Sequence, residues 1–297
     1  MRYRTLGGLK VSAVGLGAMP LSIEGRPDEA RAVATVHAAL DAGVTLLDTA
    51  DSYHRPGEDP GHNERLLARA LKSYGGDTGQ VLVATKGGRG RSADGDWTVT
   101  GAPDHLKAAA EASARRLGVD AIGLYQLHKS DPAVPFKESV GALGDLLDAG
   151  TIRLAGLSNV DADQIRRAHA MLGDRLVSVQ NRYSPEVRDS EPELRLCAEL
   201  GLAFLPWSPL GGISRSSLDG PSRLGGGPGR FAVFADVARE RGVSPQQVCL
   251  AWLTSLSPTV IPIPGASRPE TIRDSAGAAD LTLTAEESAR LAHVPAG

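Results

Sequence analysis

Short apolar runs alternate with longer amphipathic segments along the chain. The runs are rich in Val, Ile and Leu, which is typical of buried parallel strands, and the segments between them have the spacing of amphipathic helices. Strands are predicted at 11–16, 44–47, 81–85, 122–127, 152–157, 176–179, 203–206 and 260–263. Helices are predicted to begin near Asp28, Asn63, Pro103, Pro135, Asp161, Ser190, Pro245 and Pro269, with a further helix at 231–241.

Strands that alternate with helices eight times predict an α/β protein with a (β/α)8 TIM-barrel fold. A doubly wound sheet would show fewer strands and a break into a second domain, and no linker interrupts this chain. We therefore expect a single domain over residues 1–297. The opening segment 1–10 predicts a short hairpin that closes the bottom of the barrel. The glycine-rich stretch 220–229 predicts a loop or lid between the last two strands.

Composition and charge exclude several classes of protein. Hydrophobic residues make up 41% of the chain and the formal net charge is -3, so neither disorder nor binding to nucleic acid or acidic lipid is expected. The two cysteines, Cys197 and Cys249, lie in apolar helical context and are expected to be buried. The uncharged stretch 242–267 contains several prolines, which argues against a membrane-spanning helix. We expect a cytoplasmic protein without a membrane partner.

Polar side chains follow most of the predicted strands, at the end where barrels of this kind carry their chemistry. They are Asp48 and Tyr53 after the second strand, Lys86 after the third, His128 after the fourth, Ser158 and Asn159 after the fifth, Gln180 after the sixth and Trp207 after the seventh. Each alone has an ordinary explanation: an Asp in this place is more often a helix cap, and a Lys is often a solvated charge. The set is harder to explain in that way, because all of its members would share one mouth.

Four of these residues together suggest an acid–base site. A phenol has an ordinary pKa of about 10, and a nearby ammonium lowers it. Lys86 would exert this effect on Tyr53, Asp48 would keep Lys86 charged, and His128 would orient a substrate oxygen. The expected substrate is a carbonyl compound or an alcohol. No metal is expected, because the sequence contains neither His-x-His nor His-Glu-x-x-His.

These segments resemble those of the aldo-keto reductase family. LLDTADSY at 46–53 is similar to the family's segment with Asp and Tyr, VATKGG at 83–88 to its lysine segment, and LYQLHKSD at 124–131 to its histidine segment. GLSN at 156–159 and WSPLGG at 207–212 are similar to segments that contact the cofactor. The likeness extends from RYRTLG at 2–7 to LTAEESARL at 283–291.

The resemblance implies a barrel that binds NADPH across its mouth without a Rossmann domain and transfers hydride directly to an aldehyde or ketone. Tyr53 would be the proton donor, Lys86 and Asp48 would tune it, and His128 would orient the carbonyl. Ser158, Asn159 and Gln180 would hold the nicotinamide carboxamide, and Trp207 would stack on the ring. The other cofactor-binding residues implied are Gly17, Ala18, Met19, Ser208, Pro209, Leu210, Gly211, Gly265, Ser267, Arg268 and Asp274.

The sequence departs from the family pattern near the adenosine. Members often carry a basic residue after the last strand that grips the 2′-phosphate, and the segment here reads PGASRPETIRDS at 264–275. Arg268 is the nearest candidate, although it is also explained as a surface residue at a helix start. Thr271 stands where many members have Arg. NADP is therefore the expected cofactor, and NAD is the alternative.

Two residues are candidates for the substrate pocket. His54 follows Tyr53, in a segment at 54–62 that is longer than the link common in bacterial relatives and is expected to bulge into solvent. Trp97 lies in the long loop after Lys86, where packing within the loop is an equal alternative. The identity of the substrate and the oligomeric state cannot be derived from these residues.

Two other functions are compatible with parts of the pattern. Some relatives bind the nicotinamide cofactor as a sensor with little turnover, and such a regulatory module would keep the same polar residues. A barrel aldolase would use Lys86 as a Schiff-base amine, which requires a neutral lysine without a close carboxylate. Asp48 on the adjacent strand argues against the aldolase.

Overall fold

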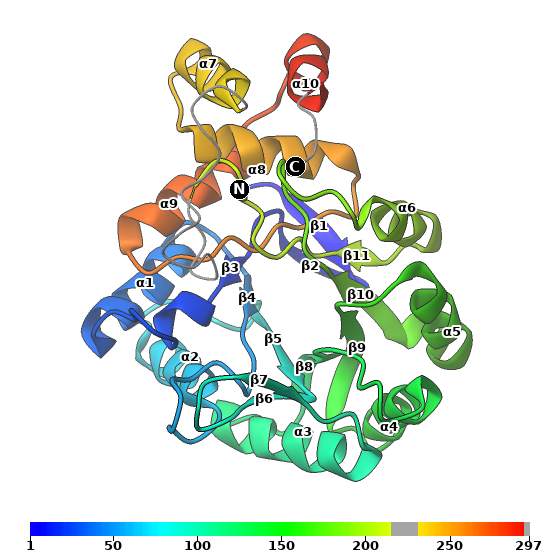
Figure 1. The fold of residues 1–297 in the computed structure, drawn as a ribbon. Coiled ribbons are helices and arrows are strands. Elements are labelled where there is room, and N and C mark those ends of the chain that lie inside the picture. Colours follow the sequence, from blue (N-terminus) through cyan, green and yellow to red (C-terminus); the bar gives the residue numbers. More distant parts are fainter. Residues whose placement is uncertain (215–230, 294–297) are drawn as a thin grey trace.

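Parallel strands form a curled sheet at the centre of the molecule, and helices surround it (Figure 1). The computed structural model describes residues 1–214 and 231–293, so the predicted lid at 220–229 lies outside the described residues. The sheet has the order β11-β10-β9-β8-β5-β4-β3. Its strands are β3 (Leu16–Gly17), β4 (Leu46–Asp48), β5 (Leu82–Gly87), β8 (Ile122–Leu127), β9 (Ile152–Ser158), β10 (Leu176–Gln180) and β11 (Ala203–Phe204). The predicted TIM-barrel fold is confirmed.

The segment 260–265 closes the barrel between β11 and β3. Ile261 N donates to Phe204 O at 2.9 Å on one side, and Gly17 N donates to Pro264 O at 2.9 Å on the other. The prediction of a strand at 260–263 is correct in position, but the segment forms only isolated bridges. Pro262 and Pro264 have no N–H group, so a continuous ladder cannot form there.

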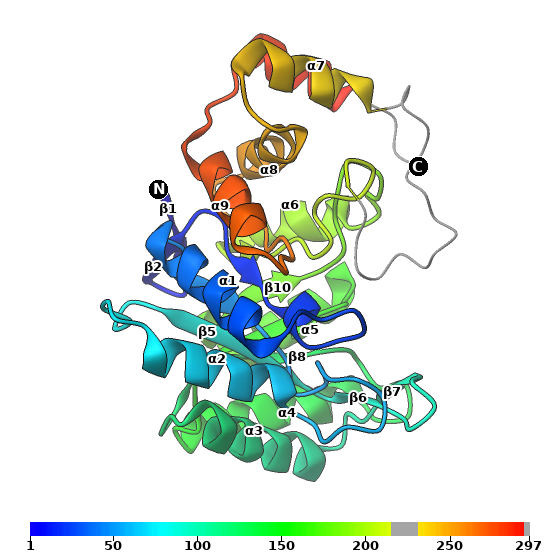
Figure 2. The same ribbon diagram turned by 90° about the vertical axis from the view of Figure 1, so that its left-hand side faces the viewer.

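An N-terminal hairpin covers the bottom of the barrel, as predicted. Strands β1 (Tyr3–Leu6) and β2 (Leu9–Ser12) pair antiparallel, and Figure 2 shows them at the opposite end of the barrel from the β6–β7 hairpin. Leu6 is fully buried in the cluster of side chains that fills the barrel interior. The predicted strand at 11–16 is wrong at its start, because Val11 and Ser12 belong to this hairpin and the barrel strand begins at Leu16.

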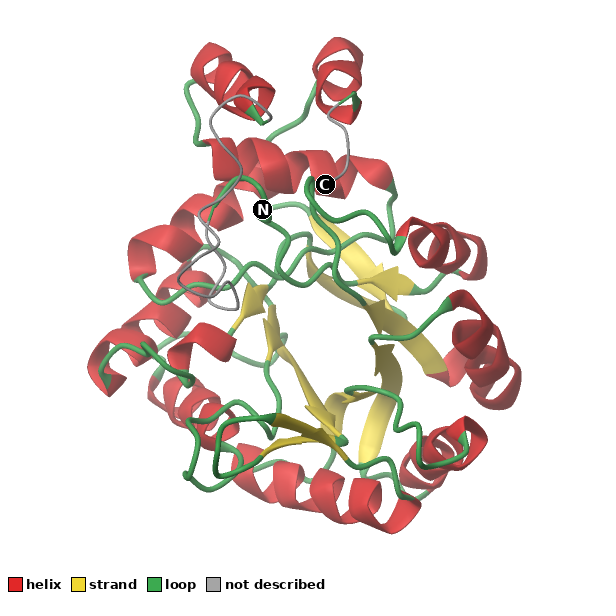
Figure 3. Ribbon diagram, viewed as in Figure 1, coloured by secondary structure: helices red, strands yellow, loops and turns green. Residues whose placement is uncertain are grey.

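The outer helices begin within one residue of the predicted positions (Figure 3). Asp28 and Asp161 each accept a hydrogen bond from a backbone N–H in the first helical turn, which explains two of these starts. The helices are α1 (Glu29–Asp41), α2 (His62–Ser73), α3 (Pro103–Leu117), α4 (Phe136–Asp148), α5 (Ala162–Leu172), α6 (Glu191–Leu200), α7 (Ala232–Arg241), α8 (Pro245–Leu256) and α9 (Pro269–Gly277).

Sequence reasoning did not predict the last helix, α10 (Ala285–Ala292). Thr284 and Glu287 form a capping box at its start, and this pattern was readable in the sequence. Short 3-10 helices, η1 (Met19–Leu21), η2 (Gly173–Arg175) and η3 (Ala278–Asp280), complete the helical elements of the described ranges. None of the helices in those ranges combines the length and apolarity that crossing a membrane requires.

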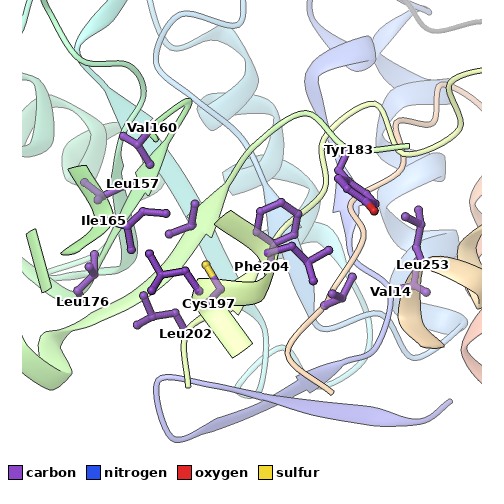
Figure 4. Packing of buried hydrophobic residues seen from close by; sticks show 14 of the residues in the cluster. Val14, Leu157, Val160, Ile165, Leu176, Tyr183, Cys197, Leu202, Phe204 and Leu253 are labelled. Atoms are coloured by element: carbon purple, nitrogen blue, oxygen red, sulfur yellow. The ribbon is translucent and has the colours of Figure 1, made fainter. Parts of the chain in front are cut away.

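Apolar side chains pack in the layer between the sheet and the outer helices (Figure 4). Tyr183 lies edge-on to Phe204 and parallel to Trp252, at centroid distances of 6.1 and 6.4 Å. Cys197 and Cys249 are buried and free, as expected. This layer fixes the strands, and the ends of the strands then position the site.

A second hairpin leaves the opposite end of the barrel directly after β5. Strands β6 (Arg89–Arg91) and β7 (Trp97–Val99) pair antiparallel. Gly88 has φ +91°, a conformation that favours glycine, and a Cβ on Gly87 would lie 1.9 Å from the Tyr125 hydroxyl. These two glycines allow the chain to turn from the barrel strand into the hairpin.

The floor of the barrel should contribute strongly to stability. Leu6→Ala removes a fully buried side chain, so we expect the free energy of unfolding to fall by about 2–5 kcal/mol. Leu9→Ala, on the same hairpin but 46% exposed, is the matched control, with an expected change of about 0.5 kcal/mol or less. Urea denaturation followed by circular dichroism measures both. Equal changes in the two variants would contradict this role of Leu6.

Candidate active site

A cavity of about 630 Å³ lies at the mouth of the barrel, where the strands end. Of the residues predicted from the sequence, those that line it are Gly17, Met19, Asp48, Tyr53, Trp97, His128, Ser158, Asn159, Gln180, Trp207, Ser208, Pro209, Leu210, Gly211, Gly265, Ser267, Arg268 and Asp274. Lys86 lies behind Tyr53 and is fully buried. The cavity therefore gathers residues from Gly17 to Ser275, which are 258 positions apart along the chain.

A buried lysine connects the two other polar groups at the base of the cavity. Lys86 donates from Nζ to Asp48 Oδ2 at 2.7 Å, to Thr49 O at 2.8 Å and to the Tyr53 hydroxyl at 3.1 Å. The pairing of β4 with β5 explains this arrangement, because Asp48 lies opposite Ala84 and Lys86 is two residues further along the same strand. Residues two apart on a strand face the same side, so Lys86 and Ala84 share a face.

The carboxylate of Asp48 is held on its second oxygen as well. Gln180 donates from Nε2 to Asp48 Oδ1 at 2.8 Å, and Gln126 approaches the same oxygen at 3.5 Å. Sequence reasoning missed Gln126, which lies inside an apolar strand pattern. These contacts fix the orientation of Asp48 and therefore the position of Lys86.

Burial and charge act on these groups in opposite directions. Burial raises the pKa of Tyr53, and this effect outweighs that of Lys86, which lowers it. Burial alone would lower the pKa of Lys86, but Asp48 and Tyr53 more than offset it, so the pKa is raised and Lys86 stays charged. Sequence reasoning identified the effect of Lys86 on Tyr53 but not the larger effect of burial. At neutral pH, Tyr53 is therefore a protonated phenol beside a cation.

His128 lies beside Tyr53 as a neutral imidazole. The two rings meet edge to face, with centroids 5.8 Å apart and an interplanar angle of 84°. Burial, followed by the charges of Lys86 and Arg89, lowers the pKa of His128 well below its usual range. Its Nδ1 lies 3.5 Å from Ser52 Oγ. A neutral ring carries one N–H donor, which can serve an oxygen atom in the cavity.

Asn159 links three of the predicted residues into one wall. Its Nδ2 donates to His128 O and to Ser158 Oγ, both at 3.0 Å, and its Oδ1 accepts from Trp207 Nε1 at 3.2 Å. Asn159 has φ 56°, a conformation that asparagine tolerates better than most residues. The indole of Trp207 is thereby held at a fixed place on the cavity wall.

Another part of the cavity wall consists of backbone, at glycines that have no room for a larger side chain. A Cβ on Gly17 would lie 2.7 Å from Ile263 O, so no larger residue fits there. A Cβ on Gly211 would lie 2.6 Å from Ser184 Oγ. The segment 208–211 therefore lines the cavity with backbone at close range.

The α9 end of the cavity carries the residues expected near an adenosine. Arg268 is exposed, and its Nε lies 3.6 Å from Glu270 Oε1. Asp274 accepts hydrogen bonds from Ser244 Oγ and Gln247 Nε2, both at 2.7 Å. The side chain of Asp274 is thus held in place, whereas Arg268 has only this long surface ion pair within the described ranges.

Besides Lys86, two of the predicted residues do not line the cavity. Ala18 is buried, and its carbonyl accepts from Asn63 Nδ2 at 2.8 Å. His54 is also buried, with its Nδ1 2.9 Å from Arg55 O, and it is not among the residues that line the cavity. The segment 54–62 does not simply bulge into solvent either, because Glu58 forms an ion pair with Arg26 at 2.7 Å and Gly61 N donates to Asp51 O.

Sequence reasoning also missed a buried acidic cluster next to the loop that carries Tyr53. Glu64 accepts from Thr85 Oγ1 at 2.6 Å and from Arg116 Nε at 2.5 Å, whereas Oδ1 of Asp51 has no partner among the described residues. Burial and the charge of Glu64 raise the pKa of Asp51 to about 8. Asp51 is therefore mainly a neutral carboxylic acid at pH 7.

Comparison with known proteins gives a consistent classification. The model of the aldo/keto reductase family matches residues 13–295. An uncharacterised oxidoreductase of Schizosaccharomyces pombe is 35% identical over 290 residues, which cover 96% of this chain and 87% of that protein.

Two solved structures are similar over nearly their whole length. The holo form of an aldo-keto reductase from Bacillus halodurans has a TM-score of 0.81 at 28% identity and covers 99% of this chain and 96% of that one. An aldo/keto reductase from Klebsiella pneumoniae in complex with NADP and acetate has a TM-score of 0.79 at 26% identity and covers 100% and 97%. The chain belongs to the aldo/keto reductase family and is an oxidoreductase.

The buried Asp51 should make stability depend on pH. Its pKa of about 8 in the folded state lies above the ordinary 3.8, so the folded protein keeps a proton that the unfolded chain loses. Stability should therefore fall as pH rises between about 4 and 8, by up to about 1.4 kcal/mol per pH unit. Asn cannot ionise, so the melting temperature of Asp51→Asn relative to wild type should rise from pH 5 to pH 8.

The exposed Asp94 provides the control for this series. The melting temperature of Asp94→Asn relative to wild type should stay constant over the same pH range, measured by differential scanning fluorimetry. A constant difference for Asp51→Asn as well would show that Asp51 does not titrate in this way.

Proposed function

We propose that the protein reduces the carbonyl group of an aldehyde or ketone to an alcohol by direct hydride transfer from NADPH. The observation that carries the proposal is the buried Lys86, which contacts both Asp48 and the Tyr53 hydroxyl at the base of the cavity. Membership of the aldo/keto reductase family supports the same reaction. The structure of the relative from Klebsiella pneumoniae contains NADP, which supports the choice of cofactor.

The residues of the cavity fit a nicotinamide dinucleotide. The cavity extends from Tyr53 to Asp274 on α9, and glycine backbone lines it where a larger residue would clash. Ser158, Asn159 and Gln180 would hold the carboxamide, with Gln180 offering Oε1 because its Nε2 is bound to Asp48. Trp207 would stack on the nicotinamide. Residues 208–211 would offer backbone N–H groups to the pyrophosphate.

The bound cofactor supplies the hydride that reaches the carbonyl carbon. Tyr53 donates its hydroxyl proton to the carbonyl oxygen, and Lys86 at 3.1 Å stabilises the phenolate that remains. The raised pKa of Tyr53 keeps the proton on the phenol until the oxygen becomes basic during hydride transfer. His128 orients the carbonyl oxygen through its N–H group.

The ion pair of Lys86 disfavours the aldolase. A Schiff-base amine has to be neutral, but Asp48 lies 2.7 Å from Lys86 and raises its pKa. Because the same residues would serve a cofactor-binding sensor, turnover is the measurement that separates the sensor from a reductase. We further propose a cytoplasmic location, which the two free, buried cysteines support.

Removal of one oxygen tests the role of Tyr53. Tyr53→Phe keeps the ring and its contact with His128 but removes the proton donor, so we expect aldehyde reduction to fall by at least about 100-fold. Binding of NADPH, measured by fluorescence titration, should stay close to that of wild type. Turnover near the wild-type rate in this variant would contradict the proton-donor role.

Substitution of Arg268 tests the preference for NADP. If Arg268 pairs with the 2′-phosphate, Arg268→Ala should weaken NADPH binding about tenfold and leave NADH binding unchanged. Arg273→Ala, on the same helix and outside the cavity lining, is the matched control. An unchanged ratio of NADPH to NADH affinity in Arg268→Ala would reject the assignment.

A further inference from the structure

Arg89 brings a positive charge into the cavity next to the proposed acid–base residues. It is the first residue of β6, three positions after Lys86, and its side chain lines the cavity together with Tyr53 and His128. Its charge is close enough to lower the pKa of both residues. The guanidinium lies over the Trp97 ring, 4.3 Å from the centroid, so its plane is supported from one side.

The guanidinium of Arg89 has no anionic partner among the described residues. No carboxylate in ranges 1–214 and 231–293 lies within 4.0 Å of its nitrogens, and its buried Nε makes no hydrogen bond in that part of the chain. Arg89 is half-buried, and this partial burial lowers its pKa. Arginine residues in such places are usually paired, because isolated buried charge is costly.

A neighbour on the same hairpin shows the contrast. Arg91 also lies over Trp97, at 4.7 Å, but it binds both carboxylate oxygens of Glu24, at 2.9 and 2.6 Å. It also donates to His54 O at 3.2 Å. Arg91 therefore anchors the hairpin, whereas Arg89, on the cavity side, has a buried Nε without a partner in the part of the chain that the structure describes.

The carboxylates that line the cavity are not placed to form an ion pair with Arg89. Asp48 is bound to Lys86 and Gln180. Glu270 and Asp274 belong to α9, which Figure 1 shows on the upper side of the barrel, whereas the β6–β7 hairpin lies on the lower side. This separation also places Arg89 away from the residues proposed to hold the cofactor phosphates.

We propose that Arg89 binds a carboxylate group of the substrate, so that the preferred substrates are aldehydes or ketones that also carry a carboxylate. This inference rests on the proposed function and specifies the substrate class of the same site. A guanidinium forms two parallel hydrogen bonds with a carboxylate, and these bonds are strong where water is excluded. The carbonyl would lie at Tyr53 and His128, and the carboxylate would face the β6–β7 hairpin.

A matched pair of substrates tests the proposal. The two aldehydes are 4-formylbenzoate and its neutral methyl ester, which have nearly the same shape and the same reactive group. Wild type should prefer the carboxylate. Arg89→Met should lower kcat/KM for 4-formylbenzoate at least about tenfold, mainly through KM, and should change the ester little. Arg89→Lys keeps a charge without the planar fork, so it should restore part of the loss.

Arg115→Met, an exposed arginine on α3, is the control variant and should leave both substrates unaffected. Equal losses for the carboxylate and the ester in Arg89→Met would overturn the proposal, because a structural role of Arg89 predicts that outcome. Unchanged kinetics for both would overturn it as well. Reduction of the ester by wild type without a preference for the carboxylate would leave the proposed function intact and reject only the inference.

Binding provides a readout that does not depend on turnover. Calorimetry with 4-formylbenzoate on Tyr53→Phe in the presence of NADPH should show binding that Arg89→Met, added to this variant, weakens at least about tenfold. If wild type reduced neither aldehyde, the proposed function would fail, and this measurement would still decide the role of Arg89. Equal affinity in the two variants would reject it.

Discussion

The ion pair between Lys86 and Asp48 is the constraint on which the rest of the site depends. Both groups are buried, and each would be very costly to bury alone. The cost is offset only because every donor of Lys86 is used, by Asp48, Thr49 and Tyr53, and because Gln180 holds the second carboxylate oxygen. The position of the Tyr53 hydroxyl therefore follows from the hydrogen-bonding needs of a buried cation.

The barrel makes this pair possible because parallel strands end at one rim. Asp48 ends β4, and Lys86 lies near the end of β5, which pairs with β4. Strand β10 lies four places away from β4 in the sheet order, yet the curvature of the sheet brings Gln180 within 2.8 Å of Asp48. A flat sheet would keep these side chains apart, so the closure of the barrel at 260–265 is part of what builds the site.

Much of this arrangement could be predicted from sequence, since strand ends and helix starts are local signals. The apolar runs that end at Asp48, Lys86 and His128 predicted which end of the barrel carries the cavity. The alternation of strands and helices predicted the barrel itself. Local signals did not fix where the first strand begins, because the alternation of Val11 and Ser12 fits an antiparallel hairpin as well as a barrel strand. They also did not show that prolines would interrupt the ladder at 260–263.

The remaining differences concern long-range effects that no local pattern contains. The burial that raises the pKa of Tyr53 results from packing of the whole rim, so the sequence showed the cation but not the larger opposing effect. The partners of Arg89, and the lack of an anion beside it, depend on how the hairpin folds back over the mouth. His54 follows Tyr53 directly in the chain, yet it is not among the residues that line the cavity, and its carbonyl accepts a hydrogen bond from Arg91.

The charges around Tyr53 also connect the proposed carbonyl reduction with the proposed preference for substrates that carry a carboxylate. Asp48 balances Lys86, whereas Arg89 has no balancing anion among the described residues, so the centre keeps a net positive charge. Burial, together with the charges of Lys86 and Arg89, lowers the pKa of His128, so the ring is neutral and can donate a single hydrogen bond. Lys86, 3.1 Å from the Tyr53 hydroxyl, would favour the negative charge that develops there when the proton is transferred. A carboxylate at Arg89 would neutralise the excess, so Lys86 would serve the reaction whereas Arg89 would select the substrate.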